Sequence, residues 1–270
     1  DPKTYAMIQK ADTVGVFQIE SRAQMATLPR LKPATFYDLV VEVALIRPGP
    51  IVGKMVHPYL NRRSGREPVR YAHPSLEPIL RRTLGVPLFQ EQLLRIAVVA
   101  AGFRPGEAEE LRRAMGFKRS TAKMKFLEAK LYRGLAERGI EAGAAEEIVQ
   151  AITSFAMYGF PESHAASFAL IAYASAYLKA HYPAAFLCSR LNCWPMGFYH
   201  PSTLISDAQR HGVEVLPVDV LRSSWDSTLE KGSCRGQPVV RLGLRFIHGL
   251  RAEQGVQLVR ERERKVYGNL

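Results

Sequence analysis

The sequence predicts a mainly α-helical protein with small β elements, an α+β fold. Two observations carry this prediction. Apolar residues recur at helical spacing through residues 34–45 and 89–180, and glycines and prolines mark the ends of successive helices. Short alternating apolar stretches, the pattern of strands, lie near the two ends of the chain, at residues 13–19, 213–216 and 239–246.

The elements of the first third are expected to be short. Residues 13–19 alternate as a strand would, and a helix over residues 21–28 follows, with Pro29 and Pro33 bracketing the break after it. A helix over residues 34–45 stops at Arg47-Pro48-Gly49-Pro50, because proline fixes the backbone and cannot continue a helix. From residue 51 to about residue 87, abundant Pro, Gly and Arg predict an irregular section.

Helices are expected to dominate the middle of the chain. Gly102 and Gly139 end two of them, and Pro105 with the acidic residues after it begins another. Ser163 is the expected N-cap of an alanine-rich helix. These helices should occupy residues 89–101, a stretch from 105, and residues 123–138, 144–158 and 165–180.

The composition changes at Asn192. A linker is expected there, followed by a short helix that ends at Gly212 and a strand over residues 213–216. The last segment looks like a new unit, with a strand over residues 239–246, a turn at Gly249 and a charged helix over residues 252–263.

Composition limits the class of protein. With 47% hydrophobic and 23% charged residues the chain is an ordinary globular protein, and 37 Lys and Arg against 25 acidic residues indicate a polyanionic partner. Cys188, Cys193 and Cys234 lack the spacing of a zinc site or a disulfide framework, so a reducing cytoplasm is the simplest interpretation. The apolar run over residues 165–178 is too short to cross a membrane.

The strongest charged feature is the segment from Leu111 to Arg133, where eight basic residues accompany one acidic residue, Glu128. Arg112 and Arg113 are adjacent, so they should point to different sides of a helix, one toward a ligand and the other toward protein or a second phosphate. Arginine suits phosphate because its planar fork binds two oxygens and keeps its charge. A solvated basic face is the alternative.

A second candidate is the bend from Tyr158 to His164. Aromatic rings at a bend can stack on bases, and Ser163 or His164 can hydrogen-bond a sugar. The alternative is a turn whose aromatic side chains pack inward. No G-x-S-x-G pattern accompanies the Ser-His pair, which disfavours a hydrolase, and the seven histidines lack metal-ligand spacing.

The sequence contains no motif of closely spaced carboxylates that could bind two catalytic metal ions. The six aspartates include no D-x-D, and Glu20, the one acidic residue that follows the first predicted strand, is expected to be structural. We therefore expect neither catalytic residues nor metal ligands within these 270 residues.

Six blocks, read in order, resemble the C-family bacterial DNA polymerases of the polymerase III alpha-subunit type. The resemblance extends over most of the chain, and the blocks are residues 14–22, 44–50, 89–92, 111–116, 158–160 with 163–166, and 178–183. Residues 195–199 and 211–220 are most similar to the error-prone, damage-inducible branch of that family.

The resemblance implies an order of domains and the part of the reaction that each domain serves. Residues 1–30 would be the edge of the palm, 31–190 the helical fingers domain, 191–232 a connector, and 233–270 the start of a helix-hairpin-helix-containing domain. The catalytic aspartates and their Mg²⁺ would lie in the palm, upstream of Asp1. Implied partners are a DNA primer-template, a dNTP, the sliding clamp and damage-tolerance accessory proteins, with no membrane.

Roles for single residues follow from the same resemblance. Those expected at the triphosphate are Arg112, Arg113, Arg47 and Lys118, and those expected at the nascent base pair and sugar are Tyr158, Ser163 and His164. Two other classes stay open: a non-catalytic nucleic-acid-binding module, and a partner-binding scaffold of a damage-tolerance complex.

Three positions depart from the family pattern. Glu162 stands where replicative relatives often have lysine, which would remove a phosphate contact. Phe89 replaces a common tyrosine, and the hairpin at Gly249-Leu250-Arg251 lacks the second glycine of the usual G-x-G.

Overall fold

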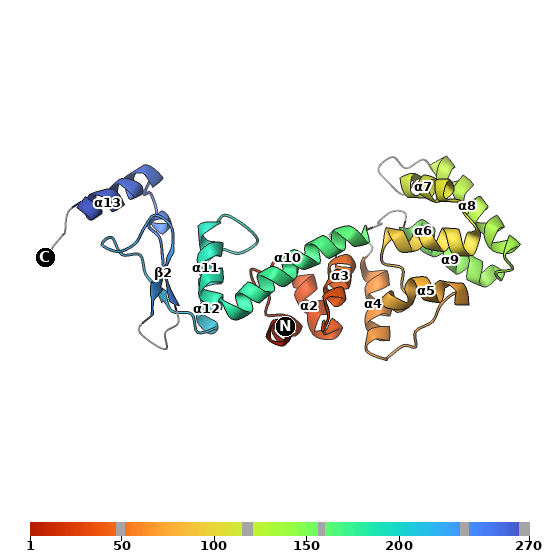
Figure 1. The fold of residues 1–270 in the computed structure, drawn as a ribbon, viewed down its shortest axis with the longest axis horizontal. Coiled ribbons are helices and arrows are strands. Elements are labelled where there is room, and N and C mark those ends of the chain that lie inside the picture. Colours follow the sequence, from red (N-terminus) through yellow and green to blue (C-terminus); the bar gives the residue numbers. More distant parts are fainter. Residues whose placement is uncertain (47–51, 115–120, 156–159, 233–237, 265–270) are drawn as a thin grey trace. The chain divides into compact units, whose positions relative to one another are not determined.

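A computed structural model describes the chain except for residues 47–51, 115–120, 156–159, 233–237 and 265–270, and it leaves out the side chains of residues 52–57, 121–124, 154 and 155 (Figure 1). The chain divides into two compact units. The central unit comprises residues 9–11 and 21–171, and the terminal unit comprises residues 1–8, 12–20 and 172–270. The described residues are mainly helical with one small sheet, so the predicted fold class is confirmed.

The central unit begins with two helices whose starts are set by capping boxes. Ser21 caps α2 (Arg22–Leu31) and Thr35 caps α3 (Phe36–Leu45), each side-chain oxygen accepting from the third residue of its helix. The expected helix from residue 21 is confirmed, but it continues through Pro29 to Leu31 and ends at Lys32, which takes the left-handed conformation.

The section over residues 51–87 is largely helical, so the prediction of an irregular section was wrong. It contains α4 (Val52–Arg63), η1 (Pro74–Leu76), α5 (Glu77–Leu80) and η2 (Arg81–Thr83). Pro74 and Pro78 stand in first turns, where proline favours a helix. The connection from α4 is held by Arg62, whose buried side chain reaches Glu67 at 3.2 Å and donates to the Leu84 carbonyl at 2.8 Å.

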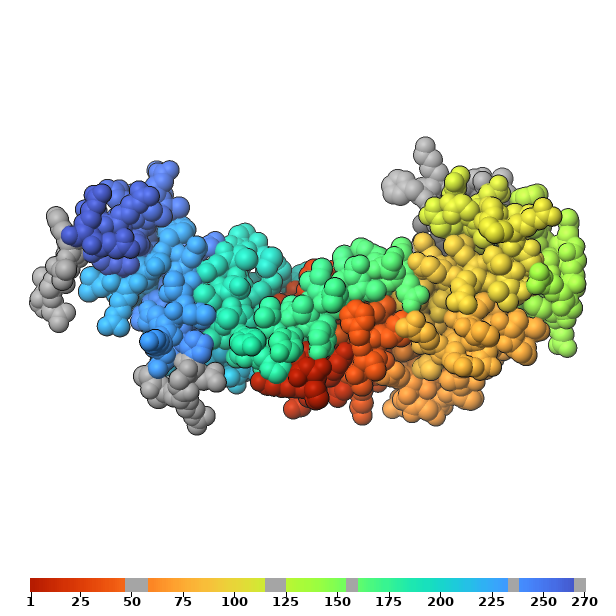
Figure 2. Space-filling view, in the orientation of Figure 1, coloured from red at the N-terminus to blue at the C-terminus, as the bar shows by residue number. Residues whose placement is uncertain are grey.

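Four further helices build the main core of the central unit: α6 (Gln90–Ala101), α7 (Pro105–Ala114), α8 (Thr121–Glu137) and α9 (Ala142–Phe155). Leu93, Leu111, Leu135 and Val149 are among its fully buried side chains. Gly102 ends α6 in the left-handed conformation, as predicted. In the space-filling view these helices, yellow to green, pack against one another (Figure 2).

Helix α10 (Glu162–His181) begins three residues earlier than predicted. Ser163 therefore lies inside the first turn, and its predicted role as N-cap was wrong. The start is set instead by the N–H of Glu162, which donates to a carboxylate oxygen of Glu91 at 3.0 Å. No helix of the described chain is both long and apolar enough to cross a membrane.

The terminal unit combines helices with a small sheet. Its helices are α1 (Pro2–Gln9), α11 (Pro183–Asn192), α12 (Pro201–Arg210) and α13 (Ala252–Arg264), with η3 (Leu244–Phe246). The sheet has the order β1-β3-β2, with β1 (Val215–Leu216) parallel and β2 (Thr228–Lys231) antiparallel to β3 (Pro238–Arg241). Leu187, Leu191, Leu204 and Val240 close the core between α11, α12 and β3.

Two strand predictions were wrong in part. The strand expected over residues 239–246 ends at Arg241 and gives way to η3, and β2 was not predicted. Residues 13–19 form turns instead of a strand, because Gly15 and Gln18 take positive φ angles of 79° and 58°. Val16 and Ile19 are both fully buried although they lie three residues apart, a spacing that two turns allow and that one face of a strand does not.

Candidate nucleotide and nucleic-acid interface

Arg112 and Arg113 lie in the last turn of α7 and converge on one carboxylate. Arg112 donates from Nε and Nη2 to the two Glu109 oxygens, at 2.8 and 2.7 Å, and Arg113 donates from Nε to Oε1 at 3.1 Å. The expectation that the adjacent arginines point to different partners was wrong, because Glu109 is three residues before one and four before the other, and both spacings share a helix face.

Arg112 and Arg113 bind the Glu109 carboxylate in different ways. The hydrogen bonds from Arg112 and then Arg113 lower the pKa of Glu109 to about 2, so it stays ionised. Arg112 holds it bidentately, whereas among the described residues Arg113 donates to it from Nε, and the Arg113 side chain is 72% exposed. Since a guanidinium has five N–H donors, Arg113 retains the larger capacity to bind an anion.

The rest of the basic segment continues onto α8. Lys125 is exposed, and Lys130 lies 2.5 Å from Glu107 of α7, so an ion pair joins the two helices. Lys118 and Arg47, both expected at the triphosphate, lie outside the described residues. The contact of the arginine pair with a phosphate therefore stays a prediction.

Ser163 and His164 are both exposed in the first turn of α10. The His164 ring lies between two aromatic side chains, 5.2 Å from the ring centre of Phe160 and 4.1 Å from that of Phe168. A short aromatic row thus follows the start of the helix, as base stacking would need. Tyr158, the third residue expected at the base pair, lies outside the described residues.

This helix start is anchored to α6 and α3. The Gln90 N–H donates to the Phe160 carbonyl at 3.1 Å. The Glu162 carboxylate lies 3.9 Å from Arg82, which stacks on the Tyr37 ring at 3.6 Å. Burial, and then the negative charge of Glu162, raises the pKa of Tyr37. Glu162 therefore has an internal partner in place of the phosphate contact that a lysine could make.

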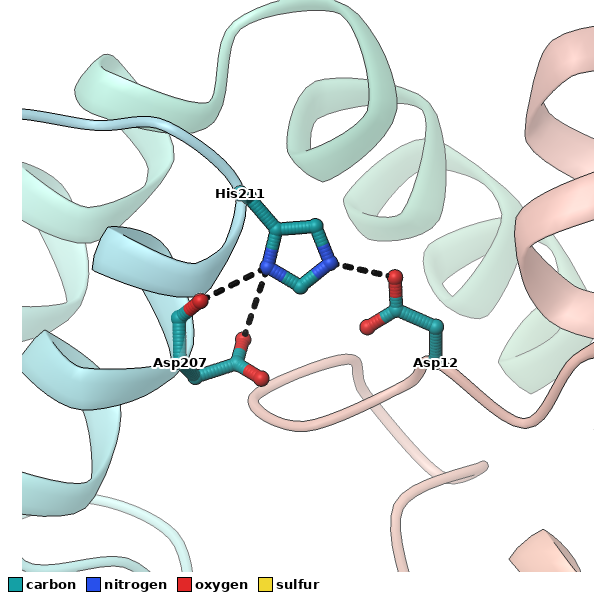
Figure 3. A group of neighbouring side chains, drawn as sticks. All are labelled: Asp12, Asp207 and His211. Atoms are coloured by element: carbon teal, nitrogen blue, oxygen red, sulfur yellow. Dashed lines mark hydrogen bonds and ion pairs between the residues drawn. The ribbon is translucent and has the colours of Figure 1, made fainter.

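A cluster of titratable side chains in the terminal unit was not foreseen from the sequence. Asp12, Asp207 and His211 place ligand atoms within 4.8 Å of one another, and His211 bridges Asp12 and the Asp207 backbone carbonyl (Figure 3). Lys179 Nζ lies 3.0 Å from Asp12 and 2.9 Å from Asp207. An ammonium group therefore takes the position that a divalent cation would need, and the cluster joins α10, α12 and residues 12–14.

The side chains of this cluster stabilise one another in their charged forms. Burial alone would raise the pKa of Asp12, but Lys179 and His211 outweigh it and lower that pKa. Burial likewise opposes the charge of His211, yet its hydrogen bonds to Asp207 and Asp12 raise its pKa. The cluster is a structural ion-pair network. Asp12 is far from Asp207 and His211 in the sequence, so no motif spacing could have predicted the cluster.

Exposed arginines, an aromatic row and a basic balance are together typical of nucleotide- and nucleic-acid-binding proteins. Residues 1–139 match the family of the bacterial DNA polymerase III alpha subunit finger domain, and the chain belongs to that family. Residues 212–270 match a helix-hairpin-helix motif. The predicted family and the presence of a helix-hairpin-helix motif are confirmed, and the match begins at residue 212, within the predicted connector.

Curated relatives carry the name error-prone DNA polymerase. The chain is 57% identical over 277 residues to that of Anaeromyxobacter dehalogenans strain 2CP-C, covering 100% of this chain and 24% of the relative. It is 56% identical over 265 residues to that of Pseudomonas aeruginosa PAO1, covering 97% and 26%. For Methylococcus capsulatus the identity is 54% over 266 residues, covering 92% and 25%. The chain thus spans about a quarter of the length of these relatives.

Proposed function

We propose that this chain is the fingers region, and part of the following domain, of an error-prone DNA-directed DNA polymerase that acts in DNA repair and translesion synthesis. The family match over residues 1–139 and the names of the relatives support this proposal. Its substrates would be a dNTP and a DNA primer-template, and its reaction the template-directed transfer of a nucleotide to the primer.

The observation that carries the proposal is the arginine pair at the end of α7, inside the matched finger region. In nucleotidyl transfer, charge spreads over the phosphate oxygens as the bond to the leaving pyrophosphate breaks, and positioned cations stabilise it. Arg113, exposed and with one hydrogen bond within the described part of the chain, would bind the triphosphate, while Glu109 and Arg112 hold its side chain at the end of the helix.

Magnesium would supply the activation of the primer 3′ hydroxyl in this chemistry. The described residues do not fit it, because the one cluster with suitable ligand atoms is neutralised by Lys179. On this proposal the metal is held by residues outside the 270. His164 and Ser163 would then face the nascent base pair and sugar from the start of α10.

Primer extension tests the proposal. The complete polypeptide that carries this chain should extend a primer in the presence of Mg²⁺ and four dNTPs, and the 270-residue chain alone should not. Extension by the isolated chain would place the metal-binding carboxylates within it and contradict the assignment. Failure of the complete, folded polypeptide to extend any primer would contradict the polymerase function itself.

The helix-hairpin-helix match favours one alternative, a non-catalytic nucleic-acid-binding module. The two functions differ in their dependence on nucleotide. A module would bind duplex DNA equally well with and without the dNTP that pairs with the template base, whereas a polymerase should bind a primer-template more tightly when that dNTP is present.

A further inference from the structure

The connection between α11 and α12 presents two large apolar side chains to solvent. We call residues 193–199 the Phe198 loop, visible beside α11 in Figure 1. Phe198 is 80% exposed, the highest value for a large hydrophobic side chain in the described part of the chain, and Met196 is 45% exposed. An exposed aromatic ring offers a flat apolar face on which another ring can stack.

The loop is anchored at its first end by an arginine. Arg245 donates to the carbonyls of Asn192 and Trp194, at 2.6 and 2.9 Å. Asp226 in turn holds Arg245 at 2.9 Å. The backbone before the exposed tip is therefore fixed by η3, which contains Arg245.

The second end of the loop is fixed as well. The Tyr199 hydroxyl donates to the Glu20 carbonyl at 3.1 Å. Gly197 has a φ of +77°, and a Cβ atom there would lie 2.6 Å from Arg190 Nη2, so this position requires glycine. With both ends fixed, little conformational entropy remains to be lost when a ligand meets Phe198.

Basic side chains, Arg190 and Arg245, lie next to the loop. Between Glu162 and Asp207 the sequence has no acidic residue. Arg190 lies against Gly197, and its buried Nε and Nη2 atoms have no hydrogen-bond partner. Each of these two arginines has a carboxylate close by: Glu20 also lies against Gly197 and interacts with Arg190, and Asp226 pairs with Arg245, so the charges at the loop are close to balanced.

A flat, exposed aromatic face suits a nucleobase, which offers its own π-face. We propose that the Phe198 ring stacks on an unpaired base of the DNA strand that the protein holds, on a loop preorganised by Arg245, Tyr199 and Gly197. This inference rests on the proposed function, since it assigns a second DNA contact to the same protein. Met196, beside the ring, would pack against the same base.

The test measures binding of the complete polypeptide to a single-stranded oligonucleotide that contains 2-aminopurine. Anisotropy gives the affinity, and quenching of the 2-aminopurine fluorescence reports stacking on that base. Phe198→Ala should weaken binding about 5- to 150-fold, equivalent to the ~1–3 kcal/mol of one base–aromatic stack, and should relieve the quenching. Phe198→Trp should retain both. Phe198→Leu, which keeps apolar area but no π-face, should lose most of both.

Tyr182→Ala is the matched control, because its ring is 56% exposed in the same acid-free segment but outside the loop, and its affinity should equal the wild type. Wild-type affinity for Phe198→Ala or Phe198→Leu would overturn the stacking contact while leaving the proposed function standing. A change in self-association at constant DNA affinity would also overturn it, with a second copy of the chain as the occupant. Failure of the unaltered protein both to bind DNA and to extend primers would instead refute the proposed function.

Discussion

Replacing Lys179 with methionine removes a buried ammonium group while keeping an unbranched side chain of similar length. The Lys179 side chain is 5% exposed and lies within hydrogen-bond distance of three oxygens, on Asp12, Val14 and Asp207. Removing one partner of a buried ion pair typically costs about 3–5 kcal/mol, because the other charge stays buried and unpaired. His211 and Arg210 still face the carboxylates, so we expect the lower end, about 3 kcal/mol.

Urea unfolding followed by tryptophan fluorescence measures this loss. Both tryptophans, Trp194 and Trp225, belong to the terminal unit, so the signal reports the unit that contains Lys179. With a slope of about 1–3 kcal/mol per molar urea, the midpoint should fall by about 1–3 M. Lys130→Met, which removes a partly exposed pair on α8, should leave this transition unchanged.

A double variant sharpens the test. Lys179→Met with Asp207→Asn should recover part of the loss, because deleting both partners of a buried pair is less harmful than deleting one. A midpoint for Lys179→Met close to that of the wild type would show that the network contributes nothing to stability. A double variant less stable than the sum of the two single changes would refute the role of the unpaired carboxylate.

Three further predictions concern pH, salt and packing. Because the pKa of His211 is raised above its ordinary value, its contribution is complete below about pH 6.5 and is lost as the pH rises through the folded-state value, so His211→Gln should destabilise the terminal unit more at pH 5.5 than at pH 8.5 in urea titrations. DNA affinity should fall roughly a thousandfold between 50 and 200 mM salt if about six phosphates are contacted, and anisotropy titrations that show a flat profile would rule out the basic surface as a DNA site. Gly134→Ala would place a Cβ atom 2.0 Å from the Ala101 carbonyl and should lower stability by about 1–3 kcal/mol in calorimetry, whereas Gly143→Ala, with open space around it, should be neutral or raise stability by up to about 1 kcal/mol.

Local signals in the sequence were sufficient for much of the helical fold. The start of α7 at Pro105 and the end of α6 at Gly102 depend on residues with strong intrinsic preferences, and both were predicted. The turns at residues 13–19 were mistaken for a strand because Val14 and Val16 alternate in the sequence, and the positive φ angles of Gly15 and Gln18 that form the turns leave no mark in that pattern. Where periodicity reports burial alone, it cannot distinguish turns from strands.

The parts that could not be predicted depend on contacts between distant residues. Lys179 meets Asp12 across 167 positions of sequence, and Arg245 reaches the Phe198 loop from beyond the sheet. The convergence of Arg112 and Arg113 on Glu109 was, by contrast, readable from helical spacing and was missed because the two arginines were considered without the glutamate before them.

The most direct test of the proposed function is single-nucleotide incorporation by the complete polypeptide with Arg113→Ala. Loss of a charge-assisted contact worth about 1.5–3 kcal/mol should lower kcat/KM for the dNTP about 10- to 150-fold, with primer-template affinity little changed and only partial rescue by Arg113→Lys. Arg81→Ala is the matched control, since Arg81 is also 72% exposed and paired with a glutamate four residues away, and it should incorporate nucleotides as the wild type does. Wild-type kcat/KM for Arg113→Ala, or a loss that lies wholly in DNA binding, would contradict the assignment of this helix end to the triphosphate.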